Sequence, residues 1–218
     1  MDLELLKELC DTPGVPGLED KIAKIVQNNI LKLCQSHEID AMGNNIFRVN
    51  KKIEKAPTIL VDAHMDEVGF LVSNIESNGM IRVIALGGID PKLFYGQRLS
   101  IWGKKPIEAT VAAIPPHISN KSDAVTQVED CIIDTGLKYK DVIKFINIGD
   151  QVTFSTKCEI GYDRVLSKAL DDRVGLFVLI EAVKVLSKKK LNCNFIASAS
   201  VQEEMGLRGA RIINSKVN

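Results

Sequence analysis

One short stretch, VDAHMDEVGF at residues 61–70, places a histidine and three carboxylates among apolar residues that suit a buried strand. His64 is followed by Asp66 and Glu67, and Asp62 precedes it. Burying an unpaired charge is costly, so these side chains need partners. A lone histidine on such a segment is usually a core residue with its hydrogen bonds satisfied. A chemical role for His64 therefore depends on partner residues elsewhere in the chain.

Two acidic pairs occur later in the chain. In KALDDRVG, Asp171 and Asp172 open an expected helix, where aspartate is also a common cap. In SVQEEMGLRGA, Glu203 and Glu204 directly follow an apolar strand, and a solvated loop is the ordinary explanation. For each pair taken alone, the structural explanation is the more frequent one.

Together, the three clusters lie at three strand-to-helix junctions. In an open α/β sheet, sites form beyond the carboxyl ends of the strands, so the clusters can meet there. Carboxylates with one imidazole suit a divalent cation such as zinc, cobalt or manganese. A carboxylate that bridges two ions would explain the paired acids. His64 would bind metal through one ring nitrogen while a neighbouring carboxylate orients it.

The elements that position these clusters follow an α/β rhythm at both ends of the chain. Helical spacing, a hairpin and a nearly continuous apolar strand of the kind found inside covered sheets precede residue 68. A helix, a buried strand and the start of another helix follow residue 161. The expected elements are helices at 3–10, 18–34, 171–186 and from 206, a hairpin at 38–50, and strands at 57–65 and 193–201.

Between these two parts, residues 69–161 contain a series of short strands. Turn signals such as those at 77–80 and 115–117 separate them. We therefore expect a small β-rich domain inserted into an α/β layer, with domain segments 1–68, 69–161 and 162–218.

The overall composition excludes several classes of partner. Lys plus Arg (28) balances Asp plus Glu (28), so nothing favours nucleic acid or an anionic membrane. The sequence has no apolar run of about 18 residues and no signal peptide at its start. The five cysteines are scattered without a C-x-x-C pair, which is typical of reduced thiols in a cytoplasmic protein.

Three motifs, AHMDEVGF, KALDDRVG and QEEMGLRGA, resemble those of the dinuclear metallo-aminopeptidases of the TET, or deblocking and glutamyl aminopeptidase, group. The resemblance covers essentially the whole chain. It implies an α/β fold, with a partial α/β/α metallopeptidase layer that is incomplete at the C-terminus. The β-rich insertion would be a PDZ-like dimerisation domain, so a homo-oligomer is expected.

The resemblance also implies roles for five residues. His64 would bind one metal, Asp171 would bridge both, and Glu204 would bind the second. Glu203 would be the general base and Asp66 the companion catalytic acid beside His64. The implied activity is removal of N-terminal residues from peptides by a water that two divalent ions, zinc or cobalt, activate.

The sequence departs from the family pattern at its end. Family members continue further and supply another Asp and a late His, whereas this sequence stops at RIINSKVN. We therefore expect an incomplete metal site, an exposed apolar face and impaired activity. Two alternatives stay open: a catalytically silent fragment that assembles with full-length subunits, and a glycan hydrolase. The adjacent Glu203–Glu204 pair and the single tryptophan argue against the glycan hydrolase.

Overall fold

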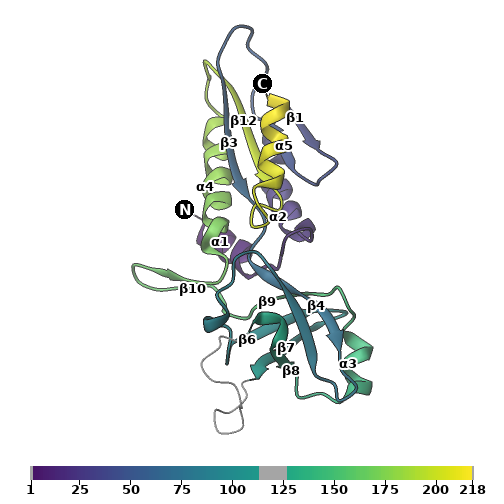
Figure 1. Ribbon diagram of the computed structural model, residues 1–218. Coiled ribbons are helices and arrows are strands. Elements are labelled where there is room, and N and C mark those ends of the chain that lie inside the picture. Colours follow the sequence, from purple (N-terminus) through teal and green to yellow (C-terminus); the bar gives the residue numbers. More distant parts are fainter. Residues whose placement is uncertain (1, 113–126, 218) are drawn as a thin grey trace. The chain divides into compact units, whose positions relative to one another are not determined.

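The computed structural model describes residues 2–112 and 127–217, and they form two compact units (Figure 1). The sheet unit consists of Met1–Glu67 and Lys157–Asn218, and the barrel unit of Val68–Thr156. The insertion expected from the sequence ends at residue 161, whereas the barrel unit ends at Thr156. The turn expected at 115–117 lies outside the described residues.

The sheet unit is built on a four-stranded sheet with the order β1-β2-β12-β3. Strands β1 (Ser36–Ile39) and β2 (Asn45–Arg48) form the antiparallel hairpin that the sequence predicts. Strand β12 (Asn194–Ser200) runs antiparallel to β2 and parallel to β3 (Thr58–His64), with Ser200 opposite His64. The carboxyl ends of β3 and β12 therefore lie side by side at one end of the sheet, and the predicted site residues follow there.

Helices pack on both faces of this sheet. Helices α1 (Leu3–Asp11), α2 (Asp20–Ile30) and α4 (Leu170–Leu186) share one core with the sheet face that carries Phe47. Helix α5 (Arg208–Val217) contributes Ile213 to a smaller core with Ile46, the neighbour of Phe47. Because successive strand residues point to opposite faces, α5 covers the other side of the sheet. The remaining short elements are η1 (Leu31–Leu33), β10 (Glu159–Ile160) and β11 (Val165–Leu166).

Strand β3 differs from its predicted setting inside a covered sheet, because within the described residues it lies at the sheet edge. Ile59 and Val61 are 47% and 40% exposed. The outer side of α4 is also apolar, with exposed Val178 and Val185 beside a hollow of about 610 Å³. Edge position depends on which strands pair, and the apolar pattern of one strand does not encode it.

The barrel unit is a closed barrel with the strand order β4-β5-β8-β7-β6-β9 and its own buried core. The sequence predicts short strands here but no helix, so helix α3 (Tyr139–Phe145) is an unpredicted element. Over the described residues, no helix has the length and apolar character needed to cross a membrane. The elements of this unit are β4 (Gly69–Ile75), β5 (Ile81–Leu86), η2 (Pro91–Leu93), β6 (Arg98–Trp102), β7 (Pro106–Ala112), η3 (Val128–Asp130), β8 (Ile132–Asp134), α3 (Tyr139–Phe145) and β9 (Gln151–Phe154).

Candidate metal centre

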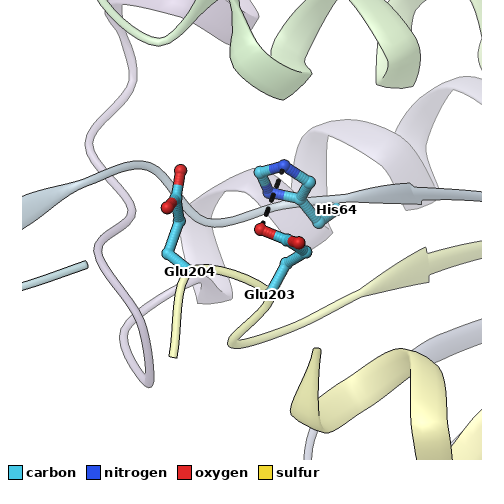
Figure 2. A group of neighbouring side chains, drawn as sticks. All are labelled: His64, Glu203 and Glu204. Atoms are coloured by element: carbon cyan, nitrogen blue, oxygen red, sulfur yellow. Dashed lines mark ion pairs between the residues drawn. The ribbon is translucent and has the colours of Figure 1, made fainter. Parts of the chain in front are cut away.

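Three segments of the sheet unit bring their polar side chains together: the end of β3, the start of α4 and the turn after β12. Ligand atoms of His64, Glu203 and Glu204 lie within 4.8 Å of one another. Figure 2 shows the Glu203 carboxylate facing the His64 ring, with Glu204 beside them. Strands β3 and β12 are parallel neighbours, so their carboxyl ends lie side by side. Residues 136 or more positions apart in the sequence therefore lie at the same end of the sheet.

The His64 ring is oriented by its own strand end. Its Nδ1 lies 3.0 Å from the backbone carbonyl of Asp66, which only accepts hydrogen bonds, so Nδ1 carries the proton. The other nitrogen, Nε2, lies 3.1 Å from Asp171 Oδ1 and 3.8 Å from Glu203 Oε2. Two ligand atoms that share a tetrahedral cation at ~2.1 Å are ~3.4 Å apart. The spacing around Nε2 therefore matches that of a cation's ligands.

Asp66 lies behind the ligand atoms and not among them. Its side chain has no exposed surface, and its two oxygens accept the backbone N–H groups of Glu203 and Glu204, each at 3.0 Å. Burial alone would raise the pKa of Asp66, but its hydrogen bonds with His64 and the two N–H groups lower it overall. Asp66 therefore fixes both the imidazole and the turn that carries the two glutamates.

The Asp171–Asp172 pair divides two tasks between its members. Asp172 Oδ1 accepts the N–H of Gly175 at 3.0 Å, so the capping explanation is correct for this residue. Asp171 has non-helical φ and ψ, and its carboxylate, 87% exposed, reaches the His64 ring. A Cβ on Gly175 would collide with the Asp172 carboxylate, so a larger residue at this position of α4 would have to displace that side chain.

The charges of the cluster fit a divalent cation. Burial lowers the pKa of His64, but the larger combined effect of Asp66, Asp171 and Asp172 raises this pKa to about 9. Burial raises the pKa of Asp172 and of Glu204. Carboxylates that are partly desolvated beside one another are stabilised when a cation joins them. One imidazole with several carboxylate oxygens is also a donor set that zinc, cobalt and manganese accept.

A buried ion cluster that sequence reasoning missed supports these segments from behind. Lys168 Nζ donates to both oxygens of Glu67, at 2.8 and 2.9 Å, and Arg173 Nη2 lies 3.5 Å from the same carboxylate. Burial lowers the pKa of Lys168, which Glu67 partly opposes. Arg173 also donates to the carbonyls of Leu9 and Thr12. The cluster therefore joins Glu67, which follows Asp66, to Lys168 and Arg173, which flank the Asp171–Asp172 pair.

A signal for this cluster was present in the motifs themselves. Lys168 and Arg173 flank the aspartate pair, and Glu67 follows Asp66 directly, so charged residues of both signs accompany the expected ligands. Asp62 is likewise explained by the structure, because it accepts hydrogen bonds from Ser198 and Ser200 of the neighbouring strand. The Asp62 arrangement follows only from the pairing of β3 with β12.

All five predicted site residues lie in one region of the sheet unit. Glu203 and Glu204 both belong to the group of ligand atoms around His64, and Asp171 contacts the ring from the α4 side. Asp66 contacts the ring and the turn but is fully covered.

Comparison with protein families gives one matching family, described as M42 glutamyl aminopeptidase, over residues 43–218. The glutamyl aminopeptidase of Lactococcus lactis subsp. cremoris (strain MG1363) is 32% identical over 222 residues, covering 98% of this chain and 62% of that protein. The chain therefore spans less than two thirds of the length of this relative.

Solved structures with the same fold include aminopeptidase APDkam598 from Desulfurococcus kamchatkensis, with a TM-score of 0.89 and 31% identity over 98% of this chain and 59% of that one. The TET1 peptidase of Pyrococcus horikoshii, which can assemble into a tetrahedron or a large octahedral shell, matches with a TM-score of 0.85 and 32% identity. That match covers 97% of this chain and 64% of the peptidase. Both structures therefore match nearly the whole of this chain, which corresponds to part of their own length.

Proposed function

The chain belongs to the M42 glutamyl aminopeptidase family, and from this premise we propose that it supplies the metal centre of an aminopeptidase. The substrates would be peptides, shortened from their N-terminal end. The observation that carries the proposal is the grouping of His64, Glu203 and Glu204 ligand atoms within 4.8 Å, with Asp171 against the same imidazole.

In this proposal each residue has a distinct task. His64 and Glu204 each hold one divalent ion, zinc or cobalt, and Asp171 bridges the two. The exposed Asp171 carboxylate, 3.1 Å from Nε2, supports that bridging task. Bound cations would lower the pKa of water and polarise the scissile carbonyl.

Glu203 is proposed as the general base. Its side chain is 32% exposed and Oε2 lies 3.8 Å from His64 Nε2, so it can reach a water molecule beside the imidazole and take its proton. Asp66 would not touch substrate, because its carboxylate is covered and occupied by two N–H groups. Its contribution is to hold the His64 tautomer and the Glu203–Glu204 turn.

The complete activity is proposed for a polypeptide that adds to this chain the further length found in its relatives. This chain spans 62% of the Lactococcus lactis glutamyl aminopeptidase. For the 218-residue chain alone we expect weak metal binding and little turnover.

We also propose that the barrel unit is a PDZ-like domain through which copies of the chain associate into a homo-oligomer. The assembly of the similar TET1 peptidase into large shells supports this proposal. In that case association would survive conditions that abolish catalysis.

The glycan hydrolase alternative has less support. Paired glycosidase carboxylates stand about 5 to 9.5 Å apart, on either side of the bond they cleave. Glu203 and Glu204 are adjacent in one turn, and the ligand atoms of the His64 group lie within 4.8 Å of one another.

The test compares this chain with a fusion to the corresponding C-terminal part of the Lactococcus lactis relative. Both are supplied with Zn²⁺ or Co²⁺ and assayed on glutamyl-, lysyl- and leucyl-p-nitroanilides. The fusion should gain metal binding and cleavage together, and Glu203→Gln in the fusion should abolish cleavage while metal stays bound. Metal-free cleavage, or chelator-sensitive cleavage that survives Glu203→Gln, would overturn the proposed roles.

A further inference from the structure

Glu19 is a buried carboxylate that the proposed chemistry does not use. It is 5% exposed and lies at the start of α2, yet its side chain makes no capping hydrogen bond to that helix. Its Oε1 instead accepts the N–H of Gly17 at 2.8 Å and the N–H of Gln202 at 3.1 Å. A buried acceptor that bonds to a segment 183 positions away fixes where that segment lies.

The segment that Glu19 holds has an unusual backbone conformation. Gln202 has a φ of +53°, in the left-handed region that L side chains rarely adopt. Such a conformation persists where the surroundings over-determine it. Here Glu19 binds the Gln202 N–H, the Gln202 carbonyl accepts the N–H of Arg208 at 3.2 Å, and the Gln202 side chain accepts Arg208 Nη1 at 3.1 Å.

The left-handed residue determines how the next two residues are presented. Strand β12 ends at Ser200, and after Gln202 the N–H groups of Glu203 and Glu204 both point to the Asp66 carboxylate. Their side chains then lie beside His64. If Gln202 relaxed to an extended or right-handed conformation, the same N–H groups would be directed away from Asp66.

We propose that Glu19 is a positioning residue for the metal centre: by holding Gln202 in its left-handed conformation, it sets where Glu203 and Glu204 present their carboxylates to a divalent cation. This inference rests on the proposed function, because it supposes that a cation binds there. It also makes the loop at residues 12–19 part of the centre, although the family match begins at residue 43.

The first test uses Co²⁺ alone as the probe and follows its visible absorption as the chain is titrated. Glu19→Ala should weaken Co²⁺ binding by about 10- to 100-fold, the range for loss of a partner that supports a ligand. Glu19→Gln keeps an oxygen at the same place and should stay within about threefold of the unmodified chain. The matched control is Asn50→Ala, which removes the side-chain acceptor of the Phe195 N–H at the opposite end of β12.

Asn50→Ala should lower the melting temperature without changing Co²⁺ affinity. The proposal is overturned if Glu19→Ala lowers the melting temperature but binds Co²⁺ as tightly, and with the same spectrum, as the unmodified chain. It is also overturned if Glu19→Gln is as defective as Glu19→Ala, because an acceptor atom would then not be what matters.

A second variant, Gln202→Gly, is used if Glu19→Ala alone folds poorly. Glycine adopts positive φ without strain, so Gln202→Gly removes the need for an external hold on the backbone. In the Gln202→Gly background, adding Glu19→Ala should change Co²⁺ affinity by less than about threefold, a non-additivity expected of residues that act through one contact. Full additivity of the two substitutions would overturn the proposal.

Amide hydrogen exchange separates this inference from the proposed function. In Glu19→Ala, the amides of Gln202, Glu203 and Glu204 should exchange at least tenfold faster, and Asn50→Ala should leave them unchanged. If neither the unmodified chain nor the fusion gives a Co²⁺ spectrum, the metal centre is wrong, and this exchange measurement still decides whether Glu19 holds the turn. Unchanged exchange at all three amides would overturn the positioning role.

Discussion

Asp66 orients groups of the candidate site although its own carboxylate is not among the possible ligand atoms. Its two oxygens accept the N–H groups of Glu203 and Glu204, and its backbone carbonyl accepts Nδ1–H of His64. An amide in its place can accept with only one of its two side-chain atoms, so one N–H group would lose its partner. The orientation of the glutamate turn therefore depends on a carboxylate at this position.

Asp66→Asn should for this reason weaken Zn²⁺ binding by about 10- to 100-fold, as is typical when a group that orients a ligand is replaced. A competition titration with a chromophoric chelator measures the change. Asp62→Asn, which alters the neighbouring carboxylate that bonds to Ser198 and Ser200, is the control and should have a smaller effect. Equal losses in both variants would contradict the orienting role.

The Glu67 carboxylate pairs with two buried cations, Lys168 and Arg173. Glu67→Gln should destabilise the fold by about 3–5 kcal/mol, because removing one partner of a buried ion pair leaves uncompensated charge. Urea unfolding followed by circular dichroism measures this. The double variant Glu67→Gln/Lys168→Met restores the net charge of the cluster and should be more stable than Glu67→Gln. A double variant no more stable than the single one would show that charge is not the cause.

Helix α4 has a candidate site residue, Asp171, at its start, followed by a long apolar body. The backbone leaves the helical region at Asp171 and Asp172, and the regular helix then starts with the Asp172 cap on Gly175. Replacing a helical glycine with alanine normally gains about 1 kcal/mol from propensity. A collision with a fixed carboxylate typically costs about 1–3 kcal/mol, so here the collision should dominate.

We therefore expect Gly175→Ala to lower both the free energy of unfolding and the affinity for Zn²⁺, since Asp172 is displaced next to Asp171. Thermal unfolding and the chelator competition report the two effects. Val178→Ala, at an exposed position of the same helix, is the control and should change stability by no more than about 0.5 kcal/mol. A Gly175→Ala variant as stable as the unmodified chain would mean that the Asp172 cap is dispensable.

The elements that sequence periodicity predicts well are those with one clear apolar face. The expected helix at 3–10 is observed as Leu3–Asp11, and the expected strand at 193–201 as Asn194–Ser200. Helix α3 was missed because it has only seven residues, with Val142 as its one buried side chain. The candidate site residues could be found from their acidic motifs. The contacts that Glu19 and Glu67 make could not be predicted from the sequence, because they join segments 183 and 101 positions apart.

The sheet unit has an exposed apolar strip along β3 and α4. It consists of Ile59, Val61, Val174, Val178 and Val185, with exposures between 40% and 58%. Exposed apolar surface of this kind usually favours association, and this effect does not depend on the metal centre. The strip should therefore make the chain self-associate as its concentration rises.

Val178→Lys combined with Val185→Lys should reduce this association, because two charges would have to be desolvated in the contact. Sedimentation velocity between 1 and 50 µM compares the variant with the unmodified chain. Equal association of the two proteins would indicate that the contact lies elsewhere, with the barrel unit as the first candidate.

The barrel unit has the features of an independently stable domain. It has a closed strand order and a core cluster of its own. Residues 68–156 expressed alone should show a single cooperative thermal transition and dispersed amide resonances. A chain that is unfolded in isolation would show that the barrel depends on the sheet unit.

The pairing of the barrel's first and last strands also affects the order in which the chain folds. β3 ends at His64 and its parallel partner β12 begins at Asn194, so roughly 130 residues separate them. Because β4 pairs with β9, a barrel that has already folded draws its own ends together and shortens this loop to roughly 45 residues. The saving in closure entropy is about 1 kcal/mol. Early folding of the barrel should therefore speed the slow, long-range pairing of β3 with β12. The group of His64, Glu203 and Glu204 forms only when that pairing is complete, so it should form after the barrel unit has folded.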